Sequence, residues 1–256
     1  MEGFHFTSVH RPSGRLIALV LGATLAAWLV SYARMRGMDA GPGTDLGSFG
    51  WFIGIWLTMT VAMMLPSVAP VTLLYSRFAT APRTALFVVG YLLVWTVFGS
   101  AAYLLDRVAH AAAPSFLAWG DGGPWVAGAA LTVAGLYQLT PLKTACLRHC
   151  RSPLSYLLRQ RAGVAGTVAS GAGHGAYCVG CCAGIMLALF VLGVMSLFWM
   201  AVAGVAILGE KSLPAGEALA SAVALALVAL GCWVAVAHGS LPGLHQPGQM
   251  HVEMRR

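Results

Sequence analysis

The chain has 256 residues, of which 59% are hydrophobic and only 9% are charged, and its mean hydropathy is +0.78. A soluble domain carries about 25% charged residues, so this composition excludes an ordinary soluble enzyme or binding domain. The net charge of +7 fits the basic cytoplasmic loops of a membrane protein, and we expect a lipid bilayer rather than nucleic acid as the partner.

Seven apolar stretches follow one another along the chain. They are residues 16–33, 51–75, 85–105, 124–139, 173–194, 196–208 and 217–237. Because lipid cannot satisfy exposed backbone groups, stretches of this kind cross a membrane as helices. The sequence therefore predicts an all-α polytopic helical membrane protein. It has seven transmembrane helices if residues 196–208 cross separately, and six if they do not.

We expect one transmembrane helical domain over residues 16–238, with an N-terminal tail at 1–15 and a flexible C-terminal tail at 239–256. With the N-terminus in the cytoplasm, ten of the fifteen basic residues fall on the cytoplasmic side of the seven-helix arrangement. Cytoplasmic loops carry the excess of Lys and Arg. The sequence thus predicts a bacterial inner-membrane protein with its N-terminus inside, and a cytoplasmic basic segment at residues 143–161.

The second apolar stretch carries methionines and prolines. Met59 and Met63 share a helical face. Pro66 and Pro70 lack an N–H, which frees the carbonyl of Ala62 from its usual helical partner. Broken helices often line transport sites, and thioethers suit Cu(I). We therefore predict Met59 and Met63 as metal ligands, with ordinary packing as the alternative.

The segment KTACLRHCR, residues 143–151, carries a first group of soft ligands. Cys146 and Cys150 stand at i and i+4, so they share a face if the segment is helical, and His149 lies beside them. These three residues are predicted metal ligands. For a function in thiol–disulfide exchange, basic neighbours would lower the pKa of the two thiols; they are Lys143, Arg148 and Arg151.

The segment HGAYCVGCCAGIM, residues 174–186, carries the principal group. On a helix that begins near Gly173, the side chains of four residues fall within an arc of roughly 100° at the cytoplasmic end. They are His174, Cys178, Cys181 and Cys182. Thiolate and imidazole ligands suit Cu(I), zinc and iron–sulfur clusters. We predict a metal site, with copper favoured and zinc second. The alternative is that these cysteines pack as small hydrophobic side chains. Packing is also what we expect of the isolated Cys232.

Five segments together resemble a known family. They are AMMLPSVAP (62–70), YQLTPLKTACLRHCRSPL (137–154), CVGCCAGIM (178–186), GVMSLFWM (193–200) and EK (210–211). Through them, residues 51–211 resemble a bacterial family of predicted metal-binding integral membrane proteins. The resemblance implies membrane topology and metal contact but no established reaction. One departure is Ala183, where a tryptophan is expected after the paired cysteines.

Three functions remain open at this point. The first is metal handling, with a soft ion such as Cu(I) bound for transport, storage or delivery, and with a metallochaperone or other membrane subunits as partners. The second is a membrane thiol–disulfide electron conduit, although a conduit needs thiols toward both faces and here they gather on one. The third is a scaffold subunit of a membrane complex. No nucleotide-binding or hydrolase motif appears, so a binding function is favoured over an enzyme.

Two polar features complete the reading. Glu210 and Lys211 adjoin a short apolar stretch, and we expect them to pair with each other or to anchor the chain at the interface. Three histidines of the C-terminal segment are weaker candidates for metal binding. They are His238, His245 and His251.

Overall fold

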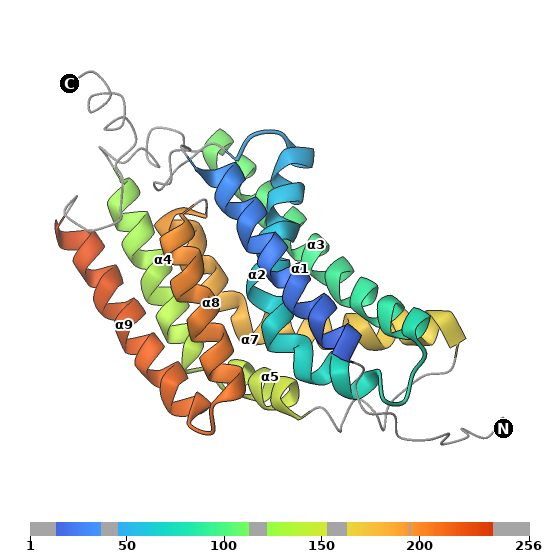
Figure 1. Ribbon diagram of the computed structural model, residues 1–256. Coiled ribbons are helices and arrows are strands. Elements are labelled where there is room, and N and C mark those ends of the chain that lie inside the picture. The colour runs from blue at the N-terminus through green and yellow to red at the C-terminus, as the bar shows by residue number, and fades with distance from the viewer. Residues whose placement is uncertain (1–13, 37–45, 113–121, 153–162, 195, 238–256) are drawn as a thin grey trace.

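A computed structural model describes residues 14–36, 46–112, 122–152, 163–194 and 196–237 (Figure 1). Most of the predicted N-terminal tail, and the C-terminal tail with its histidines, lie outside the described residues. Within the described ranges every regular element is a helix. The helices are α1 (Gly14–Met35), α2 (Phe49–Tyr75), α3 (Ala81–Ala112), α4 (Gly123–Gln138), α5 (Pro141–Arg151), α7 (Gly163–Gly193), α8 (Leu197–Ser212) and α9 (Gly216–Ala237).

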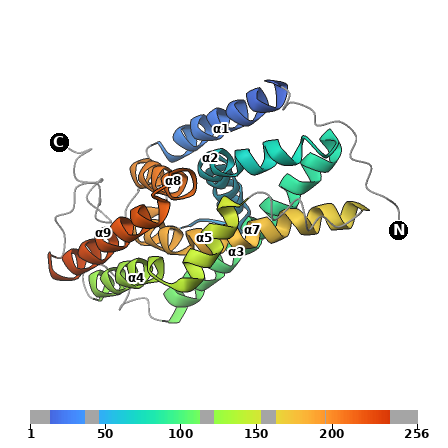
Figure 2. The ribbon, with the colours of Figure 1, turned by 90° about the horizontal axis from the view of Figure 1, so that it is seen from below.

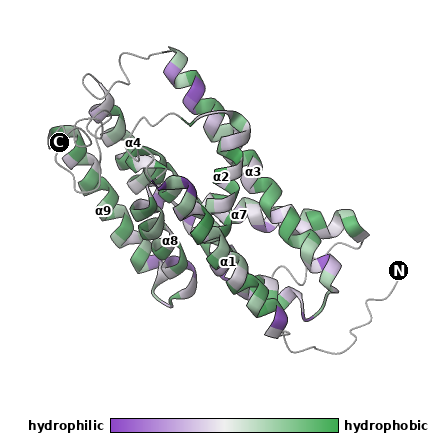
Figure 3. Cartoon of the chain, turned by 45° about the horizontal axis from the view of Figure 1, so that its top comes forward, coloured by the Kyte–Doolittle hydropathy of each residue, from purple (hydrophilic) through white to green (hydrophobic). Residues whose placement is uncertain are grey.

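Five of these helices are long and apolar enough to cross a membrane, namely α1, α2, α3, α7 and α9. Large apolar side chains face outward from several of them, as a lipid-facing surface requires. On α1 the exposed residues include Leu19, Leu21, Leu25 and Leu29. Figure 3 shows hydrophobic colours dominating along α1, α3 and α9. The prediction of an all-α helical membrane protein is confirmed.

Helices α4 and α8 are shorter, with 16 residues each. At 1.5 Å per residue each is about 24 Å long, whereas the hydrocarbon core is about 30 Å thick. Figure 1 shows α4 running opposite to α3, and α8 running opposite to α9. Gly193, with φ of 110°, ends α7, and the Ser196 side chain accepts a hydrogen bond from the Trp199 N–H at the start of α8. The stretch 196–208 therefore forms a helix of its own.

Helix α2 continues through both of its prolines. The carbonyl of Ala62, which loses its helical donor because of Pro66, accepts a hydrogen bond from the Trp28 indole N–H of α1 at 3.1 Å. The freed backbone group is thus satisfied by protein, which is how a membrane helix tolerates proline.

Helix α7 begins at Gly163, ten residues earlier than predicted. Its first half packs closely on α3, where Gly171 leaves no room for a Cβ against the Phe87 carbonyl. Small residues at helix contacts allow this approach in membranes. Because the helix starts earlier, Cys178 lies near the middle of α7 rather than in its first turns.

Helix α5 is short and amphipathic. Thr140 caps it by accepting a hydrogen bond from the Lys143 N–H, and Pro141 occupies its first turn, as is usual at a helix start. Its buried face carries Lys143, Cys146 and Cys150. Figure 2 shows α5 lying across α7, which it contacts. The fold therefore places the two cysteine segments against each other.

Candidate metal centre

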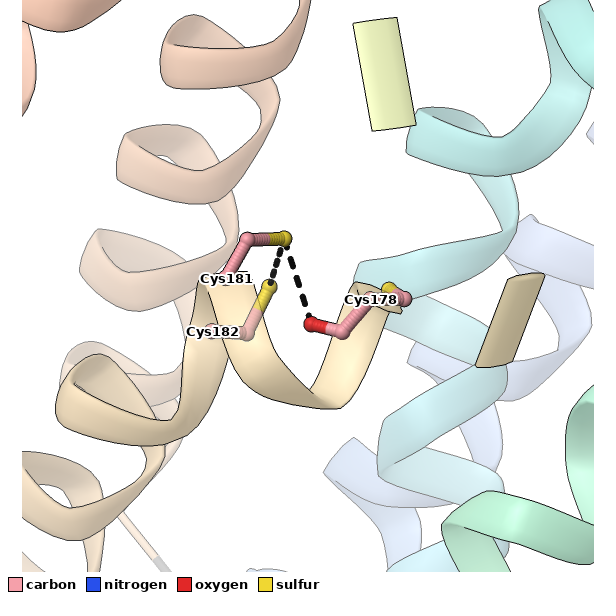
Figure 4. A group of neighbouring side chains, drawn as sticks. All are labelled: Cys178, Cys181 and Cys182. Atoms are coloured by element: carbon pink, nitrogen blue, oxygen red, sulfur yellow. Dashed lines mark hydrogen bonds between the residues drawn. The ribbon is translucent and has the colours of Figure 1, made fainter. Parts of the chain in front are cut away.

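Three cysteines of α7 form a compact group of buried thiols. The sulfurs of Cys178, Cys181 and Cys182 all lie within 4.8 Å of one another, and the side chains are 0–1% exposed. The Cys181 sulfur lies 3.6 Å from the Cys182 sulfur and 3.2 Å from the Cys178 carbonyl oxygen, and Figure 4 shows both contacts as dashed lines that diverge from the Cys181 sulfur. Three soft ligand atoms at this spacing can bind a single metal ion.

A fourth thiol reaches this group from α5. The sulfur of Cys150 lies 3.7 Å from the sulfur of Cys181. Its neighbour on the same face of α5, Cys146, lies over Gly180, where an added Cβ would stand 2.7 Å from the Cys146 sulfur. The Tyr137 hydroxyl donates to the Gly180 carbonyl at 2.6 Å and ties α4 to the same turn. The structure thus brings the two predicted cysteine groups together.

Cys178 has two further polar neighbours that sequence reasoning did not connect with it. The ammonium of Lys211, in the last turn of α8, lies 2.9 Å from the Cys178 sulfur and 3.3 Å from the Ser67 hydroxyl. The Tyr91 hydroxyl of α3 hydrogen-bonds the same sulfur at 3.0 Å. The thiol group therefore has a cation beside it.

The expected pairing of Glu210 with Lys211 is wrong. Glu210 is buried and binds Lys143 of α5 at 2.8 Å through one carboxylate oxygen, while Gln138 donates to the other at 3.0 Å. Adjacent residues on a helix point about 100° apart, so Glu210 turns toward α4 and α5 while Lys211 turns toward α2 and α7. This spacing was the available signal that the two charges have different partners.

The expectation that basic neighbours lower the pKa of the α5 thiols is also wrong. Burial raises the pKa of Cys146, and the hydrogen bond to Cys178 raises the pKa of Cys150. The three basic groups are directed elsewhere: Lys143 binds Glu210, Arg148 binds Glu217, and Arg151 donates to the Leu213 and Pro214 carbonyls. Both thiols are therefore protonated at neutral pH.

The two predicted histidine ligands contact different aromatic side chains. His174 is buried one turn before Cys178, against the rings of Phe87 and Tyr91, and does not join the group of three sulfurs. His149 stacks on Tyr177 with ring centroids 3.9 Å apart. Tyr177 is 36% exposed, so this pair marks the outer side of the α5–α7 contact.

The predicted methionine ligands lie in the core of the helix bundle. Met59 and Met63 are 1% and 3% exposed on α2, and Met63 packs against Gly204 of α8. Cys232 is exposed on α9, so the expectation that it packs in the core is wrong.

Comparison with protein families gave a match over most of the chain. The family described as PpoB2, copper chaperone, matches residues 53–234, a range that includes all five clustered cysteines and Lys211. A search of curated proteins and a search of solved structures returned no significant match. Since the matched range covers well over half of the 256 residues, the chain belongs to the PpoB2 copper chaperone family.

Proposed function

We propose that the protein binds Cu(I) within the membrane through Cys178, Cys181 and Cys182, and delivers the ion to a protein partner. The observation that carries this proposal is the convergence of three buried thiols within 4.8 Å, in a chain of a copper chaperone family. Thiolates select soft ions such as Cu(I). A delivery role is favoured over storage because a storage site has no need of exchange ligands at its edge.

Zinc is the second candidate ion. Structural zinc sites take four ligands in a tetrahedral arrangement, with Zn–S distances of about 2.3 Å. The compact group offers three thiols, and Cys150 would have to approach as the fourth. Cu(I) can be held by the three thiols as they stand, which favours copper.

Delivery needs a route by which the ion leaves the buried group. We propose that Cys150 and Cys146 of α5 form this route, with His149 at its outer end beside Tyr177. The 3.7 Å separation of the Cys150 and Cys181 sulfurs allows one sulfur to bind the ion before the other releases it. The partner is then a soluble or membrane protein with soft ligands that approaches α5.

The proposed setting is the bacterial inner membrane with the N-terminus in the cytoplasm. The alternating directions of the seven larger helices (Figure 1) would put the start of α1, helix α5 and the end of α8 on one side. Basic residues of α5, including Arg148 and Arg151, are typical of a cytoplasmic segment. The partner would accordingly approach from the cytoplasm.

Competitive Cu(I) titration against a chromophoric chelator, with thiols kept reduced, tests the proposed site. Serine at positions 178, 181 and 182 should abolish high-affinity binding, because thiolates dominate the affinity for Cu(I). The matched control is Cys232→Ser, which removes the exposed thiol of α9 and should leave the affinity unchanged. Unchanged affinity in the triple-serine protein would rule out this site.

The electron-conduit function makes a different prediction for the same preparation. The Cys181 sulfur lies 3.6–3.7 Å from two other sulfurs. This proximity is the observation that favours the electron-conduit function, because oxidation would join two of these thiols in a disulfide. Peptide mapping of protein purified without reductant would decide. A stable disulfide in the resting protein, with function lost on its removal, would replace the copper proposal by the redox one.

A further inference from the structure

The buried thiol group has a single charged side chain in direct contact with it among the described residues, and this is Lys211. Its ammonium reaches Cys178 from the last turn of α8, a different helix from the one that carries the thiols. The Ser67 hydroxyl of α2 provides a second acceptor at 3.3 Å, so three helices meet at this ammonium. The lysine is partly buried, and its position is defined by both hydrogen bonds.

A copper–thiolate site inside a membrane protein carries a net negative charge that has to be balanced. A Cu(I) ion bound by two thiolates carries one net negative charge, and an ion bound by three carries two. Uncompensated charge in a buried or membrane setting is costly, and charges there are retained when they are paired. The carboxylate nearest to Lys211 in sequence, Glu210, is occupied by Lys143 and Gln138. The Lys211 ammonium is therefore available to the sulfurs.

We propose that Lys211 is a positioning residue for the metal site: its ammonium holds the Cys178 sulfur and balances the negative charge of the Cu(I)–thiolate complex. This inference rests on the proposed function. It assigns Cys178 as the fixed ligand of the group. Cys181, which has thiols of two helices beside it, is then the ligand from which the ion is exchanged to Cys150.

The test is Cu(I) affinity in the full-length purified protein, measured by chelator competition. Lys211→Met retains the length of the side chain but removes the charge. Hydrogen bonds to charged groups contribute more free energy than hydrogen bonds between neutral groups. Loss of the Lys211 ammonium should therefore lower the Cu(I) affinity roughly 10- to 100-fold. Lys211→Arg restores the charge and should recover most of the affinity, which a merely structural role would not require.

A matched control comes from the other buried lysine. Lys143→Met combined with Glu210→Gln removes a lysine and its carboxylate partner, yet keeps an oxygen to accept from Gln138. Neither Lys143 nor Glu210 hydrogen-bonds a thiol, so the Cu(I) affinity of this double variant should equal that of the wild type. If Lys211→Met is not recovered in folded form, Lys211→Gln replaces it, with the same expectation.

A double-mutant cycle with Cys178→Ser separates the inference from the proposed function. If Lys211 acts through Cys178, the loss caused by Lys211→Met should largely vanish in the serine background. Wild-type affinity in both Lys211→Met and Lys211→Gln would overturn the role of Lys211 while leaving the copper site intact. Absence of Cu(I) binding by the wild type would remove the site and this inference together.

Discussion

The sulfur of Cys150 on α5 lies 3.7 Å from the sulfur of Cys181 on α7, although the two residues are 31 positions apart in sequence. Contact at this distance places a thiol of the short amphipathic helix at the edge of the buried group. In the proposed route, a soft ion changes ligands between these two helices without first being released to water.

Replacement of Cys150 should affect the rate of transfer more than the affinity. Cys150→Ser leaves the three α7 thiols in place but removes the proposed exchange ligand. We expect transfer of Cu(I) from the loaded protein to a chelator to slow by on the order of tenfold, as followed by stopped-flow absorbance. Cys232→Ser should transfer at the wild-type rate, and equal rates for all three proteins would exclude Cys150 from the route.

Substitution at Gly180 should destabilise the contact between α5 and α7. A Cβ added there would stand 2.7 Å from the Cys146 sulfur, and overpacking of this kind costs about 1–3 kcal/mol. Gly173→Ala is the matched control on the same helix, because nothing lies within 4 Å of the added methyl. Thermal unfolding in detergent should show a lower midpoint for Gly180→Ala alone. Adding Cys146→Ala should restore stability to Gly180→Ala; no rescue would mean that the strain arises elsewhere.

The buried pair of Lys143 and Glu210 should be intolerant of removing one partner. Both side chains are 1–2% exposed, and an uncompensated buried charge costs about 3–5 kcal/mol. Lys143→Met should therefore lower the unfolding midpoint strongly, whereas the double variant with Glu210→Gln should recover most of the loss. Arg148→Ala, which breaks the exposed pair with Glu217, should have no measurable effect. An equally small effect of Lys143→Met would contradict the assigned pairing.

The methionines of α2 remain proposed ligands for an ion that crosses the bundle. Leucine at both Met59 and Met63 retains volume and apolarity, so expression should be normal because such exchanges cost less than about 1.5 kcal/mol. We expect reduced copper tolerance or delivery in a cellular assay. A double variant indistinguishable from wild type would show that the two side chains serve only in packing. The burial of both residues and the contact of Met63 with Gly204 would then account for their presence.

The orientation in the membrane can be tested with reporter fusions. An alkaline phosphatase fusion directly after Ser152 should be inactive, because helix α5 is proposed to face the cytoplasm. A fusion between α3 and α4, within residues 113–121, should be active and serves as the control. The reverse pattern would place the thiols near the outer face and change the partner to a periplasmic one.

Much of the site could be predicted because helix geometry is local. Cys178, Cys181 and Cys182 share a face by spacing alone, and Cys146 with Cys150 share another, so the structure agrees with both groupings. The start of α7 was misplaced because residues 163–172 are apolar, small and uncharged, and contain no signal for a helix end. Length and apolarity also identified the long helices correctly.

The tertiary contacts could not be predicted from spacing. Lys211 lies 33 residues from Cys178, and no periodicity relates the last turn of α8 to the middle of α7. The Ala62 carbonyl was expected to be free because the rule for proline considers one helix only, whereas its donor Trp28 comes from α1. Contacts between helices depend on packing, which a single sequence does not specify.

Because Lys211 belongs to α8, which follows α7 in the chain, the ribosome synthesises the thiols before the lysine that contacts Cys178. At 5–20 residues per second, the stretch from Cys146 to Cys182 emerges from the ribosome within about 2–7 s, so the five thiols become available almost together. Lys211 follows later and must wait until α8 has been inserted beside α7. A nascent chain that has completed α7 but not α8 would then hold thiols without their cation, and premature capture of copper by an unfinished molecule would be disfavoured.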